Sequence, residues 1–149
     1  MANSEQSSFT DLRYLSEVIA RKNFERFALY VMPSLELSPF HRAYYQALEL
    51  FARGAIKKLI VTVPPQHGKS LGSSQLLPAY LLGVDPELKI AIASYAFTLA
   101  TKFNKRVQRI MSEGAYQTLF PDTCLKSNAR QSVAGSYLQT SEEFEVVGH

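Results

Sequence analysis

Gly68, Lys69 and Ser70, which follow one another directly, are the residues of this sequence best suited to chemistry. Backbone N–H groups at a helix start can converge on an anion, and glycine lets the backbone approach a phosphate where a Cβ would clash. The lysine supplies a mobile cation for β- and γ-phosphate oxygens, and the serine hydroxyl is a ligand for Mg²⁺. These residues predict a loop that binds the phosphates of a nucleotide.

The surrounding sequence favours this prediction but departs from the strict phosphate-loop pattern. An apolar, β-branched run at 58–63 leads into Pro64 and Pro65, and a helical pattern follows Ser70. The first glycine of the pattern G-x-x-x-x-G-K-[ST] would fall at Val63. A strand-to-helix turn with a surface lysine is therefore the alternative interpretation.

The elements that must position this loop are predicted from the spacing of apolar residues. Ser38 suits a helix cap, and Pro39 suits a first helical turn. Pro78 is expected to kink or shorten the helix after the loop, and Gly83 to stop it. Helices are expected over 9–32 (one broken helix or two short ones), 39–53, 69–82, 98–113 and 116–120.

Two short apolar runs, 58–63 and 88–94, are typical of buried parallel strands. A strand, a helix and a strand within about 40 residues predict a right-handed βαβ unit. We therefore expect an α/β fold with a three-layer, P-loop NTPase-like parallel sheet, truncated, and with an N-terminal helical segment. The predicted division of the chain is a flexible N-terminus at 1–8, a helical lead-in at 9–54 and an incomplete P-loop ATPase domain at 55–149. A hairpin is predicted at 137–140 and 144–147.

Composition sets limits on the class of protein. The chain has 149 residues, 46% of them hydrophobic, with nine Phe and eight Tyr, which is enough for one domain with a core. Its net charge of +3 permits an anionic partner without demanding one. The single cysteine, Cys124, excludes an internal disulfide and suits a reducing cytosol. No apolar stretch approaches the roughly 20 residues of a membrane span.

One face of the predicted helix over 98–113 is basic. It carries Lys102, Lys105, Arg106 and Arg109. A solvated helix face is the simpler interpretation, and contact with DNA phosphates is the alternative.

Several separated blocks of the sequence resemble, in the same order, the large terminase subunits of tailed bacteriophages, the ATPases that pump DNA into the capsid. The loop at 63–70 resembles the deviant Walker A motif of this family. The resemblance covers about 35–140. The other matching blocks are 39–41, 77–83 with Asp85 and Pro86, 92–95 with Leu99, Ala100, Arg106 and Val107, and Tyr116 with 119–121.

The resemblance implies ATP and Mg²⁺ as cofactors, with Lys69 as the catalytic lysine and Ser70 as the Mg²⁺ ligand. Gln66 stands where the family usually has an arginine, which argues against an arginine contribution here. His41 stands where many relatives carry a glutamine that reads the adenine, and its imidazole can stack or donate a hydrogen bond. The nucleotide-binding residues that the resemblance implies are Pro65, Gln66, His67, Gly68, Lys69, Ser70 and His41.

The function that the resemblance implies is that of the ATP-binding N-terminal part of the packaging motor. Its partners would be double-stranded DNA, the portal protein and the small terminase subunit, in the cytoplasm of the bacterial host and away from membranes. An exposed edge of the truncated sheet favours self-association.

Hydrolysis is expected to be impaired, because no apolar strand followed by paired carboxylates is present. Glu142, Glu143 and Glu145 precede or interrupt apolar residues instead. The alternatives are a non-catalytic prophage remnant or interaction module, and another P-loop NTPase such as a helicase.

Overall fold

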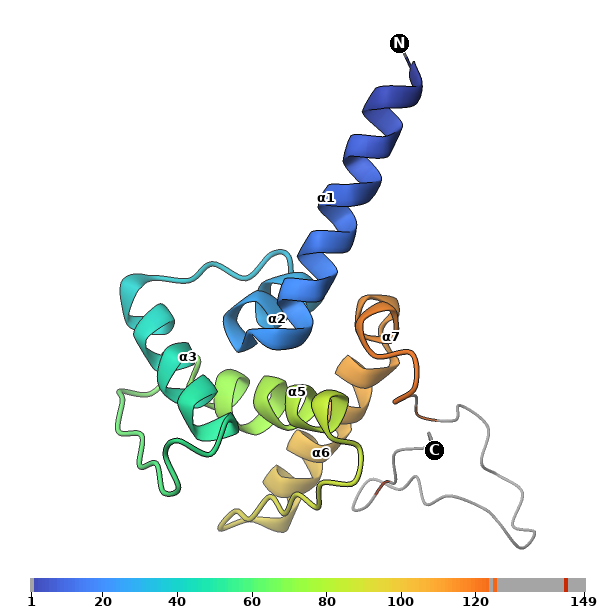
Figure 1. Ribbon diagram of the computed structural model, residues 1–149. Helices are drawn as coiled ribbons and strands as arrows, with labels where there is room; N and C mark the ends of the chain where they lie inside the picture. Colours follow the sequence, from blue (N-terminus) through green and yellow to red (C-terminus); the bar gives the residue numbers. More distant parts are fainter. Residues whose placement is uncertain (1, 124, 126–143, 145–149) are drawn as a thin grey trace, which may run out of the picture.

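The chain folds into helices joined by loops. The structure is a computed structural model that describes residues 2–123, 125 and 144, with the backbone alone for 2–10 (Figure 1). Short segments α4 and α5 flank a π-helical segment, η1, and the three form one helical run over 69–84. In order, the elements are α1 (Ala2–Lys22), α2 (Phe24–Val31), α3 (Pro39–Ala52), α4 (Lys69–Leu71), η1 (Gly72–Leu76), α5 (Leu77–Val84), α6 (Phe97–Ser112) and α7 (Gly114–Leu119).

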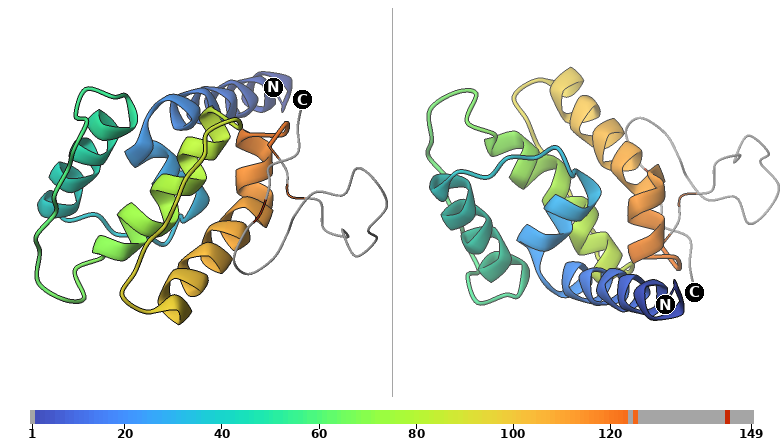
Figure 2. Two further views of the ribbon diagram at one scale, coloured as in Figure 1. Left: turned by 90° about the horizontal axis from the view of Figure 1, so that it is seen from below. Right: turned by 90° about the horizontal axis from the view of Figure 1, so that it is seen from above.

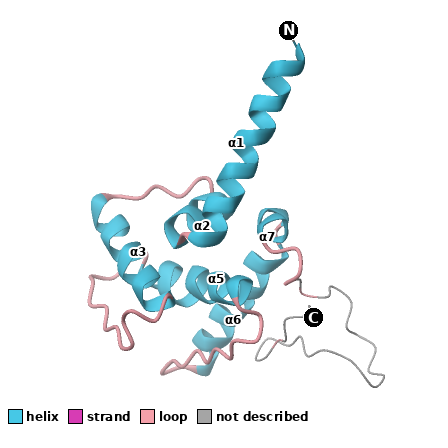
Figure 3. Ribbon diagram, viewed as in Figure 1, coloured by secondary structure: helices cyan, strands magenta, loops and turns pink. Residues whose placement is uncertain are grey.

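The predicted α/β fold with a parallel sheet is wrong for the part of the chain that the structure describes. Residues 2–123, 125 and 144 contain no strand, and Figure 3 shows helices and loops alone. The segments at 58–63 and 88–94 make no backbone hydrogen bond to one another, and Figure 2 shows them apart. A strand requires a neighbour about 4.8 Å away, so apolar sequence alone does not make these segments a sheet.

The predicted helices are present, and their bounds differ from the predicted ones by two residues or fewer, except that α1 begins at Ala2 instead of residue 9. Ser38 caps α3, because its side chain accepts a hydrogen bond from the backbone N–H of His41, and the His41 ring bonds back to Ser38. The break expected within 9–32 falls at Asn23, whose side chain accepts a hydrogen bond from the backbone N–H of Arg26. Two separate helices, α1 and α2, result.

The helical run over 69–84 lies at the centre of the molecule. Its α5 part contacts α2, α3 and α6, while η1 contacts α3 and α6 (Figures 1 and 2). Helix α7 packs against α1, α2 and α6. Helix α1 begins at Ala2, within the stretch predicted as a flexible terminus, and its first half projects away from the other helices.

Aromatic rings make up much of the core. Phe27 of α2 is fully buried, and its ring centroid lies 5.2 Å from that of Tyr80, 6.0 Å from that of Phe120 and 6.1 Å from that of Tyr116. The Tyr116 hydroxyl donates a hydrogen bond of 3.0 Å to the carbonyl of Ala79. These contacts join α2, α5 and α7 into one packed unit.

Pro78 does not shorten the helical run, and Gly83 does not end it. The helical run passes through Pro78, which lies in the first turn of α5 directly after the π-helical segment. The run ends at Val84, one residue beyond the predicted stop. Gly83 instead makes room for a ring, because a Cβ at this position would lie 2.5 Å from Cδ2 of Phe120.

The hairpin predicted at 137–140 and 144–147 lies outside the described residues, apart from Phe144. The same holds for Cys124 and for the carboxylates of Glu142, Glu143 and Glu145.

Replacing Gly83 by alanine is expected to destabilise the fold. The added methyl group would overlap the Phe120 ring, and overpacking of this kind lowers the free energy of unfolding by about 1–3 kcal/mol. Urea unfolding followed by circular dichroism measures the change. Gly114→Ala is the matched control, because a Cβ at Gly114 would meet nothing within 4 Å. Equal stability of the two variants would contradict this account of Gly83.

Candidate phosphate-binding loop

The loop before α4 has a backbone shape that suits anion binding. Gln66 and Gly68 both have left-handed backbone angles, with φ of 66° and 69°. Lys69, the next residue, begins the helix. A left-handed residue followed by a right-handed one turns successive N–H groups toward a common point, as in phosphate-binding nests. A left-handed conformation is uncommon for a residue other than glycine, so Gln66 stores strain at this turn.

The backbone N–H groups at the helix start are free to bind a ligand. Those of Gly68, Lys69 and Ser70 make no hydrogen bond to another described residue, and no side chain caps this helix end. The helical run that follows adds the positive end of its dipole at the same point. Unsatisfied donors together with a positive end are the conditions under which a helix start binds an anion.

The side chains predicted for the site are brought together by this turn. Lys69 and Ser70 are exposed, and neither side chain pairs with another described residue. Pro65 and His67 are also exposed, and Nδ1 of His67 lies 2.8 Å from the carbonyl oxygen of Pro65. Gln66 is exposed at the tip of the turn. The loop therefore presents a cation, a hydroxyl and free N–H groups to solvent over a few residues.

His41, the remaining predicted site residue, lies directly against the loop. Its Nε2 atom is 3.4 Å from the place that a Cβ of Gly68 would occupy. On the other side of the ring, Nδ1 accepts a hydrogen bond of 3.3 Å from the backbone N–H of Ser38. Nδ1 also lies 2.9 Å from Ser38 Oγ, which leaves Nε2 as the ring nitrogen on the side of the loop. The sequence did not indicate that this histidine also belongs to the cap of α3.

Tyr44 and Gly72 support the loop, and the sequence analysis missed both. The Tyr44 hydroxyl donates a hydrogen bond of 2.8 Å to the carbonyl oxygen of Lys69, which also accepts one of 2.9 Å from Ser73 Oγ. A Cβ at Gly72 would lie 2.7 Å from Cε1 of Tyr44, so the ring reaches the helix only because residue 72 is glycine. The sequence places Tyr44 in the apolar stripe of its helix. Because the hydroxyl of a buried tyrosine usually needs a hydrogen-bond partner, a tyrosine in this stripe could have indicated a polar contact to a neighbouring segment.

Phe40 extends this support at the start of α3. Its ring stacks on that of Tyr44 with centroids 6.2 Å apart, and meets the His67 ring edge-on at 6.5 Å. The first two turns of α3 thus form the wall against which the loop and the beginning of the helical run pack.

Burial raises the pKa of the phenols in this wall. It raises that of Tyr45 to about 12, with a smaller contribution from the neighbouring Tyr44. The pKa of Tyr44 is also raised, mainly by burial. In each case removal from water disfavours the charged phenolate.

Comparison with known protein families, curated proteins and solved structures finds no match to this chain. Within the described part of the chain, no helix combines the length and the apolar character needed to cross a bilayer.

Tyr45 is expected to make the fold sensitive to alkaline pH. Because its folded-state pKa is raised, the stability that the neutral phenol contributes is complete below about pH 10 and is lost as the pH rises toward 12. Tyr45→Phe cannot ionise, so it should lose less stability than the unchanged chain between pH 9 and pH 11.5. Urea midpoints at both pH values measure this difference.

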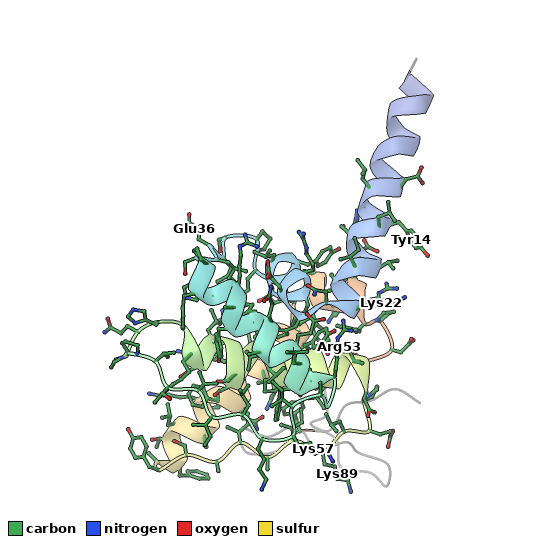
Figure 4. All side chains as sticks on the ribbon, turned by 60° about the vertical axis from the view of Figure 1, so that its left-hand side comes forward. Tyr14, Lys22, Glu36, Arg53, Lys57 and Lys89 are labelled. Atoms are coloured by element: carbon green, nitrogen blue, oxygen red, sulfur yellow. The ribbon has the colours of Figure 1, made fainter. Side chains whose placement is uncertain are left out.

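Tyr14→Phe provides the control for this measurement, because the Tyr14 side chain is exposed on α1 (Figure 4). Its alkaline loss of stability should equal that of the unchanged chain. A Tyr45→Phe variant that loses as much stability as the Tyr14→Phe variant would refute the predicted role of Tyr45.

Proposed function

We propose that this chain binds ATP through its phosphates at residues 65–70. One observation carries the proposal. The backbone N–H groups of Gly68, Lys69 and Ser70 are unpaired and lie at the start of a long helical run. Gly68 has a left-handed backbone conformation, and the side chain of Lys69 is exposed. The neighbouring helix α3 also holds the loop in place, through the hydrogen bond from Tyr44 to the carbonyl of Lys69.

Each residue of the loop has a definite task in this proposal. The N–H groups bind oxygens of the β-phosphate, and the Lys69 ammonium lies beside the β- and γ-phosphates. His41 donates from Nε2 to the nucleotide held by the loop, because this nitrogen faces Gly68. Pro65, Gln66 and His67 shape the turn that directs the donors outward.

Ser70 is the residue that would hold Mg²⁺. Its hydroxyl is exposed and has no partner among the described residues, so it is free to accept a metal. Bound Mg²⁺ would neutralise charge on the phosphate oxygens. Hydrolysis also requires a carboxylate that orients the attacking water, and we assign no residue to that task. The proposal is therefore for nucleotide binding with little or no turnover.

The wider role follows from the resemblance of the sequence blocks to the large terminase subunits of tailed bacteriophages. We propose that the chain corresponds to the N-terminal part of their packaging ATPase, in the cytoplasm of the bacterial host. Double-stranded DNA, the portal protein and the small terminase subunit are partners within this proposal. The order of the matching blocks along the chain supports it. The parallel sheet that the resemblance implies is not formed by the residues that the structure describes.

Lys69→Ala is expected to weaken binding of ATP by at least about tenfold, because a charge-assisted contact to phosphate contributes about 1.5–3 kcal/mol. Fluorescence anisotropy of an ATP analogue with a fluorescent ribose measures the dissociation constant. Lys57→Ala is the matched control. It removes the same charge from an exposed lysine outside the loop (Figure 4).

The Mg²⁺ ligand is tested in the same titration. Ser70→Ala should bind ATP without Mg²⁺ as the unchanged chain does, but gain less affinity when Mg²⁺ is added. If Lys69→Ala and Lys57→Ala bind ATP equally well, the loop is not a phosphate site and the proposal fails.

A further inference from the structure

The outer face of α6 carries a row of cations that form no ion pair with any residue the structure describes. Lys102, Lys105, Arg106 and Arg109 are all exposed, and their spacing places them on one face of the helix. None of them forms an ion pair with another described residue. Val107 and Met111 lie on the opposite face and are buried. The helix is therefore anchored by one side and presents to solvent the other side, which carries the four cations.

The charge around this face is of one sign over a long stretch of sequence. Residues 88–112 include five cations, the fifth being Lys89, and no Asp or Glu. The whole chain has a net charge of only +3, so its positive charge is concentrated here. A concentration of like charge raises the local potential and attracts polyanions. The row runs from Lys102 to Arg109, eight residues or about 10 Å of helix, which spans two or three phosphates of one nucleic-acid strand.

Two aromatic side chains at the N-terminal end of the same helix are exposed to solvent. Tyr95 is 96% exposed and Phe97 is 67% exposed. Neither ring contacts another aromatic ring among the described residues. Exposed aromatic rings near the start of a helix that also carries a row of cations match the way in which proteins bind single-stranded nucleic acid, with bases on the rings and phosphates on the cations.

We infer that α6, with Tyr95 and Phe97 at its start, binds single-stranded nucleic acid. The bases of a duplex are already stacked on one another, so exposed rings favour an unpaired strand. An anionic membrane fits less well, because a helix that lies in a bilayer surface needs a free apolar face, and that of α6 is buried. This surface shares no residue with the ATP-binding loop, so either proposal can fail without the other.

The cations are tested by the salt dependence of binding to a fluorescein-labelled oligothymidylate of 20 nucleotides. Each phosphate contact to a single strand contributes about 0.7 to the slope of log K against log salt. The double variant Lys102→Gln and Arg106→Gln should bind at least tenfold more weakly and reduce the slope by about 1.4. The double variant Lys22→Gln and Arg26→Gln carries the same change in net charge on α1 and α2 (Lys22 is labelled in Figure 4) and should leave both quantities nearly unchanged.

The stacking residue is tested by fluorescence. The chain has no tryptophan, so Tyr95→Trp introduces a single indole whose emission should be quenched when the oligothymidylate binds. Tyr95→Ala should weaken binding by about five- to a hundredfold, since one stacked base contributes about 1–3 kcal/mol. Tyr14→Ala removes another exposed ring, from α1, and should bind as the unchanged chain does.

Three results would overturn the inference. The first is a duplex of equal length that binds more tightly than the single strand. The second is an equal loss of affinity in the two double variants, which would show that net charge alone is responsible. The third is an indole whose emission does not change on binding. Lys69→Ala should leave binding of the oligonucleotide unchanged, which separates this test from that of the ATP-binding loop.

Discussion

Close approach of aromatic rings to one helical run is the constraint on which the rest of this structure depends. The run over 69–84 has glycine where Tyr44 meets it at one end and where Phe120 meets it at the other, at Gly72 and Gly83. Any larger side chain at these two positions would push the rings away. Through these contacts α3 and the segment after α7 are fixed to the same central element, and so is the loop that precedes it.

The loop depends on this packing for its shape. Tyr44 bonds the carbonyl of Lys69, and His41 fills the space beside Gly68, so α3 holds both sides of the turn. The π-helical segment that follows belongs to the same arrangement, since Ser73 within it bonds the same carbonyl. A wider helical turn of this kind often occurs at functional sites. The N–H donors of the loop form a surface suited to a compact anion. The basic row of α6 forms a second surface, which is suited to an extended anion.

The segments at 58–63 and 88–94 show that a strand-like sequence pattern does not by itself produce a sheet. Leu59 and Val61 are partly buried against the core while Ile60, between them, is 92% exposed, which is the alternation of a strand. Ile92 packs against the core in the same way. What these segments lack is a neighbour among the described residues, and hydrogen bonding to a neighbour is what defines a sheet. The prediction of buried strands was therefore wrong here, although one alternating pattern of exposure is present at 59–61.

The sequence by itself determined most of the helices and the cap at Ser38, because those signals act over three or four residues. It also determined the loop at 65–70 and the basic face of α6, since both depend on neighbours along the chain. Only the tertiary structure decided that the fold is helical where a sheet was expected. It alone placed Tyr44 and His41 beside the loop and assigned Gly72 and Gly83 to ring contacts. Each of these depends on segments far apart in the sequence meeting in space, and no periodicity encodes such meetings.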